Sequence, residues 1–331
     1  MSSEPLAKND LRPASPPVSQ PSSLFDSAFL RRLESLTLLV RQARSGQWQG
    51  ARRSLKRGQS VEFADYRPYV PGDDFRLVDW SAFARLERFF LKLFVEEEEQ
   101  HLHLLIDTSR SMDWPRETSA AAFNKLAYAQ KAAAALGYVA LAGLDRVSVS
   151  AFDAGLTPAL PPRRGRAQAA ALFKALAALT PAGPTDLNQS LRQYAAQARQ
   201  PGPLLIFSDL FETVPPSAAA PAPSSGPPGS AGLLALLSRR FEVTLIHLLS
   251  PDEADPVLQG DWRLLDSETG HSVEITADDE ALSRYRAGLR AWQTELHRWC
   301  GRRGVSYVPV TTAVPFESFI FSFLRRQGVL K

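Results

Sequence analysis

The sequence predicts an α/β fold in which helices cover both faces of a doubly wound, mostly parallel sheet. From residue 100 onward, short apolar runs typical of strands alternate with longer helical patterns, and strands joined through helices become parallel by right-handed crossovers. The composition is 44% hydrophobic and 22% charged over 331 residues, which is enough apolar material for a core. Two predicted strands end directly in an acid, Asp107 and Asp209, and ligands of this fold class bind at that edge of the sheet.

The first part of the chain is expected to hold a tail and a smaller module of a helix and strands. Residues 1–23 are rich in Ser and Pro, so they bury too little apolar surface to offset the entropy of ordering, and we expect a disordered tail. Residues 24–98 form the N-terminal module. Its helical pattern has apolar residues at three- and four-residue spacing from Phe25 to Val40. Short strands follow, and the last, over residues 89–95, could pair with the next strand across the acidic turn that follows it.

Residues 99–331 form the larger α/β domain, interrupted by a Pro/Ala/Ser-rich loop at 215–230. Its predicted elements are, in chain order, a strand at 101–106, a helix at 120–144, a strand at 146–152, helices at 165–179 and 186–198, a strand at 204–207, a helix at 233–237, a strand at 243–249, a hairpin at 262–275, a helix at 279–300, a strand at 305–310 and a terminal helix at 316–324.

Charge and cysteine content exclude several classes of protein. Lys and Arg number 38 against 35 Asp and Glu, a net charge of +3 that is small for a protein built to neutralise nucleic-acid phosphates. The single cysteine, Cys300, excludes an internal disulfide framework and a cysteine-based zinc site. Residues 1–10 show no apolar signal segment, and the longest apolar run, 132–144, is too short to span a bilayer. We therefore expect a cytoplasmic protein without a membrane span.

The strongest chemical signal is Asp107-Thr108-Ser109-Arg110-Ser111, directly after an apolar strand. A carboxylate and two hydroxyls at alternate positions of one turn can point into the same small space, and such hard oxygen ligands suit Mg²⁺ or Mn²⁺. Thr185, in a loop that opens a helix, and Asp209, at the end of another strand, add two oxygens of the same kind. We expect all five side chains to surround one cation at the carboxyl edge of the sheet.

Other interpretations of these residues stay open. The turn could be structural only, with Ser and Thr bonded to local backbone, or the chain could be a scaffold that keeps the fold and holds no ion. A hydrolase could use Asp107 and Asp209 with the metal. An aspartic protease would need a second matching motif, which Phe207-Ser208-Asp209-Leu210 does not provide, and the sequence has neither a GxSxG elbow nor a P-loop. We therefore expect no enzymatic activity.

The order of these five residues resembles the metal-ion-dependent adhesion site of von Willebrand factor A domains, which consists of an Asp-x-Ser-x-Ser motif, then a Thr, then an Asp. The resemblance implies that Ser109, Ser111 and Thr185 ligate the metal directly, while Asp107 and Asp209 act at least partly through waters. It also implies that the open coordination position takes a carboxylate from a partner protein.

A second block of residues resembles the signature of a bacterial family, domain of unknown function family 58, in which it precedes a von Willebrand A-like domain. The matching residues are Gly58, Glu62, Phe63, Arg67, Tyr69, Pro71 to Asp74, Arg76, Asp79, Trp80, Ala84, Arg85 and the segment 264–270. The resemblance implies an adaptor or co-chaperone that works with a MoxR-type AAA+ ATPase in the activation or assembly of a client protein.

The charged residues of this signature have two interpretations. Alternating arginines and acids could form an internal ion-pair network that braces the two modules. Alternatively they form a docking face for the partner, in which an arginine binds a carboxylate bidentately and a tryptophan anchors the contact. The candidate partner-binding residues are Arg67, Arg76, Asp73, Asp74, Asp79 and Trp80.

Overall fold

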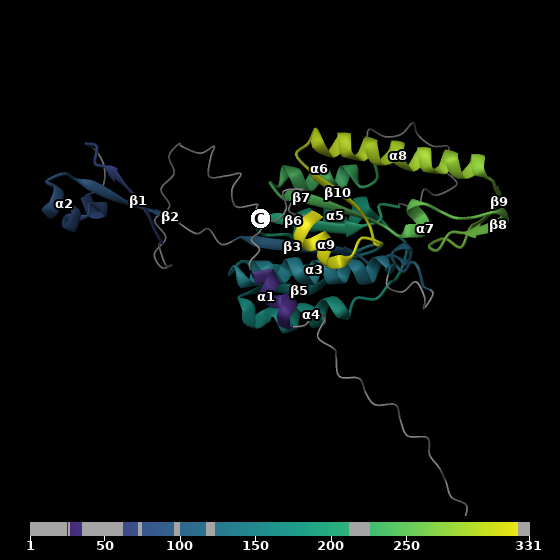
Figure 1. The fold of residues 1–331 in the computed structure, drawn as a ribbon, viewed down its shortest axis with the longest axis horizontal. Helices are drawn as coiled ribbons and strands as arrows, with labels where there is room; N and C mark the ends of the chain where they lie inside the picture. The colour runs from purple at the N-terminus through teal and green to yellow at the C-terminus, as the bar shows by residue number, and fades with distance from the viewer. Residues whose placement is uncertain are drawn as a thin grey trace, which may run out of the picture.

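The computed structural model describes residues 25, 27–34, 62–71, 75–95, 100–116, 123–211 and 226–323. The predicted tail at 1–23 and most of the predicted loop at 215–230 lie outside this part of the chain. Figure 1 shows the order of the elements along the chain.

A six-stranded sheet forms the centre of the larger domain, in the order β10-β7-β6-β3-β4-β5. Its strands are β3 (His101–Asp107), β4 (Arg146–Phe152), β5 (Leu156–Arg164), β6 (Pro203–Ser208), β7 (Glu242–Leu249) and β10 (Ser306–Thr311). Every neighbouring pair is parallel except β4 and β5, which are antiparallel. The mostly parallel, doubly wound α/β fold predicted from the sequence is thereby confirmed.

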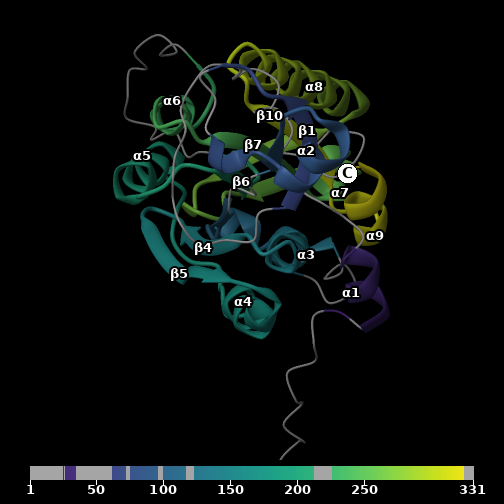
Figure 2. The same ribbon diagram turned by 90° about the vertical axis from the view of Figure 1, so that its left-hand side faces the viewer.

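Two layers of helices cover the sheet, one on each face (Figure 2). One layer holds α1 (Ser27–Glu34), α3 (Lys125–Ala142) and α4 (Ala169–Ala177), and the other holds α5 (Leu187–Gln197), α6 (Ser230–Ser238) and α8 (Asp279–Gly301). A hydrophobic cluster lies on each face of the sheet, and alternate residues of β3 point into the two clusters. Leu104 and Ile106 pack in the cluster that contains α3, and Leu105 packs in the one that contains α5. Because both faces are covered, residues 104–106 of the strand form a continuous apolar run.

Helix α1 packs on the larger domain, although its sequence precedes the small module. Leu33 is fully buried in the cluster of α3, the ring of Phe25 stacks 5.7 Å from that of Phe316, and Arg32 pairs with Glu317 at 2.7 Å. Phe316 and Glu317 belong to α9 (Phe316–Ser318), which continues as a π-helical turn, η6 (Phe319–Phe323). The two ends of the described chain therefore close over the same face of α3.

The small module pairs β1 (Glu62–Pro68) with β2 (Phe90–Val95) in an antiparallel ribbon. The expectation that residues 89–95 pair with the following strand is therefore wrong, since both neighbours of β3 are strands of the central sheet. Between β1 and β2, η2 (Phe75–Leu77) and α2 (Trp80–Leu86) replace some of the predicted short strands. Asp79 starts α2 as its N-cap, accepting hydrogen bonds from the backbone N–H of Ser81 and Ala82.

Strand β5 is an element that the sequence analysis did not predict. It contains Pro158, Pro161 and Pro162, and proline cannot donate to a strand ladder. The structure places this strand at the edge of the sheet, where the missing N–H groups can face away from a neighbour.

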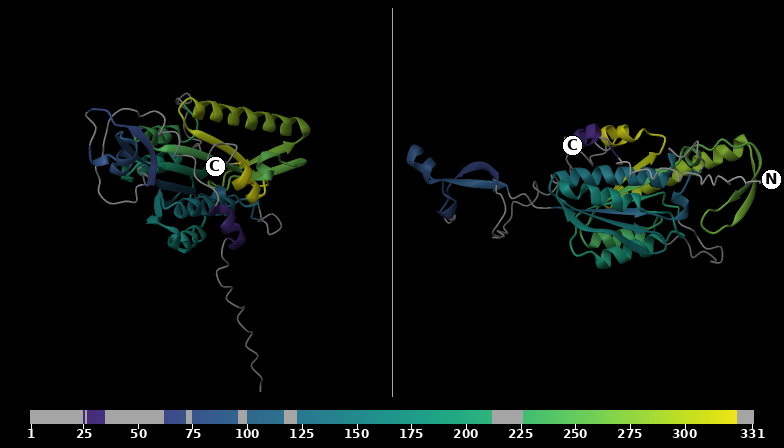
Figure 3. Two further views of the ribbon diagram at one scale, coloured as in Figure 1. Left: turned by 60° about the vertical axis from the view of Figure 1, so that its left-hand side comes forward. Right: turned by 90° about the horizontal axis from the view of Figure 1, so that it is seen from below.

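A second ribbon stands outside the sheet. Strands β8 (Gly260–Leu265) and β9 (Ser272–Ala277) form an antiparallel hairpin, as predicted for 262–275, and Figure 3 shows it beside one end of α8. A short helix, α7 (Pro251–Ala254), precedes it. None of the helices that the structure describes is both long enough and apolar enough to cross a membrane.

Candidate cation and carboxylate site at the sheet edge

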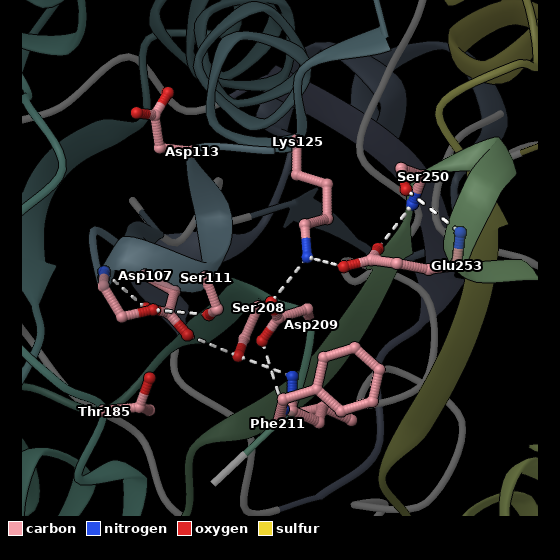
Figure 4. A network of polar contacts seen from close by, with 12 residues as sticks. Asp107, Ser111, Asp113, Lys125, Thr185, Ser208, Asp209, Phe211, Ser250 and Glu253 are labelled. Atoms are coloured by element: carbon pink, nitrogen blue, oxygen red, sulfur yellow. Dashed lines mark hydrogen bonds and ion pairs between the residues drawn. The ribbon is translucent and has the colours of Figure 1, made fainter. Parts of the chain in front are cut away.

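The site lies where the adjacent parallel strands β3 and β6 end. Ile106 of β3 is paired with Phe207 of β6, so Asp107 and Ser208 leave the sheet side by side (Figure 4). Asp107, Ser208 and Asp209 are all fully buried. Two acids are thus held close together at one end of the sheet, as the sequence predicted from the strand ends.

Both oxygens of the Asp107 carboxylate accept hydrogen bonds. Oδ1 accepts the backbone N–H of Ser109 at 2.9 Å and Oδ2 accepts the Ser208 hydroxyl at 2.6 Å. Burial and the negative charge of Asp209 nevertheless raise the pKa of Asp107 to about 7. Within the part of the chain that the structure describes, no basic side chain pairs with Asp107. A cation would relieve this excess of negative charge.

The two serine hydroxyls of the motif lie next to one another. Ser109 Oγ and Ser111 Oγ are 3.0 Å apart, and Ser109 is fully buried. Two neighbouring ligands of an octahedral ion bound at about 2.1 Å are about 3.0 Å apart. The hydroxyls thus already have the separation that adjacent ligands of Mg²⁺ require.

Thr185 reaches the site on a loop bonded to the motif. The backbone N–H of Ala182 donates to the carbonyl of Thr108 at 2.7 Å, and that of Arg110 donates to the carbonyl of Gly183 at 3.1 Å. The Thr185 hydroxyl is hydrogen bonded to Glu268, at the tip of the β8–β9 hairpin, at 2.7 Å. A carboxylate therefore already lies against one of the predicted metal ligands.

Asp209 is held by a lysine that the sequence analysis missed. The ammonium of Lys125, in the first turn of α3, lies 2.7 Å from Asp209 Oδ2 and 2.5 Å from Glu253 Oε1 (Figure 4). Burial alone would lower the pKa of Lys125, but the two carboxylates outweigh burial and raise it. Asp209 Oδ1 accepts the backbone N–H of Phe211 at 3.1 Å. Both oxygens of Asp209 thus have donors within the protein.

Two local sequence patterns lie next to Lys125 and Glu253 and could have drawn attention to them. Glu253 forms a capping box with Ser250 at the start of α7, directly after the apolar strand β7, and Ser-x-x-Glu is a readable helix start. Lys125 follows Asn124, the N-cap of α3. Neither pattern indicates that the two side chains meet.

The residues fit a divalent cation in one part of the site. Asp107, Ser109, Ser111 and Thr185 supply hard oxygens beside an excess of buried negative charge, which suits Mg²⁺ or Mn²⁺. Asp209 differs, because its Oδ2 is already paired with Lys125 and its Oδ1 accepts the backbone N–H of Phe211. It could contribute to the ion only indirectly, through its charge.

The structure describes the side chains of three of the six candidate partner-binding residues, all of them in the small module. Asp79 is buried and caps α2. Trp80 is 58% exposed and packs edge-on against Phe83 and Phe89. Arg76 is exposed in η2. Asp73, Asp74 and the side chain of Arg67 lie outside the described residues, so a docking face at these positions stays a prediction.

Comparison with known proteins identifies the family. The model of the family "Protein of unknown function DUF58" matches residues 65–295. "Uncharacterized protein Rv1480" of Mycobacterium tuberculosis is 25% identical over 320 residues, which cover 95% of each chain.

Comparison with solved structures also gives partial matches. A von Willebrand factor type A protein from Catenulispora acidiphila matches 72% of this chain and 43% of its own, with 14% identity and a TM-score of 0.38. The von Willebrand factor domain of the type V pili tip protein Mfa5 from Porphyromonas gingivalis matches 71% and 97%, with 14% identity and a TM-score of 0.33.

The mostly parallel sheet with helices on both faces makes the larger domain a doubly wound α/β domain. The chain belongs to the DUF58 family.

Proposed function

We propose that this chain is a non-enzymatic protein-binding module, whose sheet-edge site takes Mg²⁺ or Mn²⁺ and presents it to an acidic side chain of another protein. The observation that carries the proposal is the separation of 3.0 Å between the hydroxyls of Ser109 and Ser111, next to the buried Asp107. Two neutral hydroxyls and one carboxylate would leave the ion with net positive charge, and such an ion attracts a further carboxylate.

The Lys125–Asp209 pair supports this charge balance. Because Asp209 is paired with Lys125, the carboxylate left to face the cation is mainly that of Asp107. An ion held by few charged ligands stays electrophilic, and this favours a partner's carboxylate over further protein ligands. Asp209 is therefore proposed to influence the cation through its charge rather than as a direct ligand.

The proposed partners are a MoxR-type AAA+ ATPase and a client protein that the ATPase activates or assembles. The support is the family membership together with a von Willebrand A-like domain, a fold that mediates protein interactions, at one end of which the site lies. The adaptor would hold the client through its cation while the ATPase supplies the work of remodelling.

Thermal unfolding of the full chain with and without Mn²⁺ tests the cation. An ion that binds only the folded state raises its stability, by about 2.7 kcal/mol at one hundred times the dissociation constant. We expect Mn²⁺ to raise the melting temperature of the wild type. It should not change the melting temperature of Asp107→Asn or Ser109→Ala. The control Asp279→Asn, at an exposed position, should respond like the wild type. An equal response of all four proteins would refute the proposed site.

A pull-down with a MoxR-type AAA+ ATPase tests the partnership. We expect the tagged chain to retain the ATPase in the presence of Mg²⁺ and ATP. Absence of any retention under these conditions would contradict the adaptor role, whatever the outcome of the Mn²⁺ measurement.

A further inference from the structure

The carboxylate of Glu268 binds Thr185 with both of its oxygens. The Thr185 hydroxyl donates to Oε1 at 2.7 Å and the Thr185 backbone N–H donates to Oε2 at 2.9 Å. The two residues are 83 positions apart, so this contact joins the tip of the β8–β9 hairpin to the loop that opens α5. Thr185 itself is buried.

The turn of the hairpin holds Glu268 in position. Asp266 Oδ1 accepts the backbone N–H of Glu268 at 2.8 Å and that of Thr269 at 3.1 Å, and the N–H of Asp266 donates to the carbonyl of His271 at 2.7 Å. Gly270 takes the left-handed conformation, with φ of +73°, that such a turn needs. The carboxylate is thus presented at the end of an ordered tip.

The hairpin that carries Glu268 contributes little to the core. Every residue of β8 is exposed, including Leu265, and Val273 of β9 is 61% exposed. Figure 3 shows the ribbon extending beside the end of α8. Because the ribbon is not packed inside the domain, it could leave the site without unfolding the sheet.

We propose that Glu268 is an internal ligand of the sheet-edge site, occupying at Thr185 the place that an acidic side chain of the partner takes. This inference rests on the function proposed above and specifies the partner's contact as a glutamate or aspartate at the tip of an exposed turn or hairpin. Partner binding then exchanges one carboxylate for another, and the β8–β9 hairpin is displaced.

Competition between Glu268 and an external carboxylate predicts a measurable change in affinity. A tethered ligand acts at an effective concentration in the millimolar range, so an external carboxylate of equal intrinsic affinity displaces it only at a comparable free concentration. Removing the internal carboxylate should therefore raise the apparent affinity for an external acidic turn by about tenfold or more.

A peptide copy of the hairpin is the probe. We would synthesise residues 262–275 with added terminal cysteines joined as a disulfide and a fluorophore, and measure its anisotropy on the full chain with Mn²⁺ present. We expect the peptide to bind Glu268→Ala and Glu268→Gln at least about tenfold more tightly than the wild type. Glu274→Ala, which removes an exposed acid of the same hairpin, should match the wild type.

Two further arms define the contact. A peptide with Gln in place of its central Glu should not bind the Glu268→Ala protein, and the Thr185→Val substitution placed in that protein should abolish binding of the original peptide. Equal binding to the wild type and to both Glu268 variants, or binding to none of them, would overturn the proposal.

The Mn²⁺ response of the same samples separates the two claims. If Mn²⁺ stabilises the Glu268→Ala protein and the peptide does not bind it, the internal-ligand proposal fails and the cation site stands. If the peptide binds Glu268→Ala selectively and Mn²⁺ has no effect on any protein, the internal ligand stands and the cation fails.

Discussion

The ammonium of Lys125 lies 2.7 Å from Asp209, and neither side chain is exposed to solvent. This pair separates the two strand-end acids into different roles. Asp209 has a cationic partner inside the protein, whereas Asp107 has hydrogen-bond donors and a pKa raised to about 7 by burial and by Asp209. We therefore expect a cation to bind at Asp107, Ser109 and Ser111 rather than at Asp209.

Replacing Lys125 with Met should strongly destabilise the protein. The change leaves the buried Asp209 and the partly buried Glu253 without their counter-charge, and breaking a buried pair in this way typically costs about 3–5 kcal/mol. Urea denaturation followed by circular dichroism measures the loss. Lys131→Met, on an exposed position of the same helix, should change the midpoint little, and equal losses for the two variants would contradict the assigned role of Lys125.

The loop that presents Thr185 depends on Gly183. This glycine has φ of +61°, and an added Cβ would lie 3.1 Å from a carboxylate oxygen of Asp153. A left-handed conformation costs other residues roughly 1–2 kcal/mol. Gly183→Ala should therefore lower the stability by about this amount and weaken Mn²⁺ binding, because Thr185 moves with the loop.

The matched control is Gly155→Ala, where an added Cβ meets nothing within 4 Å. Isothermal titration with Mn²⁺ and urea denaturation would be run on both variants. A Gly183→Ala protein with unchanged Mn²⁺ affinity would show that Thr185 does not contribute to the cation site.

The buried His103 should make a contribution to stability that is lost as the pH falls below neutral, opposite in sign to that of Asp107, whose raised pKa favours the folded state on acidification. Burial, reinforced by His101, lowers the pKa of His103 from 6.5 to about 3. As the pH falls through 6.5, His103 is protonated in the unfolded chain but stays neutral in the folded chain. The stability that the neutral His103 allows is therefore fully present above pH 6.5 and is lost as the pH falls toward 3. By pH 5 the protonation of His103 in the unfolded chain should have lowered the free energy of unfolding by about 2 kcal/mol.

Urea midpoints at pH 7.5 and pH 5 measure this loss. His103→Gln can keep a hydrogen bond to Tyr194, which the imidazole Nδ1 makes at 2.6 Å, and should show a smaller loss at pH 5 than the wild type. His271→Gln, at an exposed position, serves as the control. Parallel pH profiles for the wild type and His103→Gln would rule out the buried histidine as the cause.

The sheet and its acidic edge could be predicted because their signals are local. Strand β3 is buried on both faces, its residues 104–106 form an apolar run, and Asp107 is its last residue. Strand β5 was not predicted because its three prolines disfavour a strand. A strand can accommodate them here because it lies at the edge of the sheet.

The partners of the candidate site residues could not be predicted from local patterns. Lys125 meets residues 84 and 128 positions away, and Thr185 meets Glu268 across 83. Such contacts depend on how loops after different strands converge, which no spacing rule encodes. The expected ligands were found from the resemblance and the strand ends, while the lysine and the internal carboxylate emerged only from the tertiary structure.

A crystal of the full chain soaked in Mn²⁺ and measured for anomalous scattering tests the central claim most directly. We predict one strong peak at ligand distance, roughly 2.1 to 2.3 Å, from the hydroxyls of Ser109 and Ser111 and absent in Asp107→Asn crystals. Well-ordered crystals of the wild type with no peak beside these hydroxyls would contradict the account.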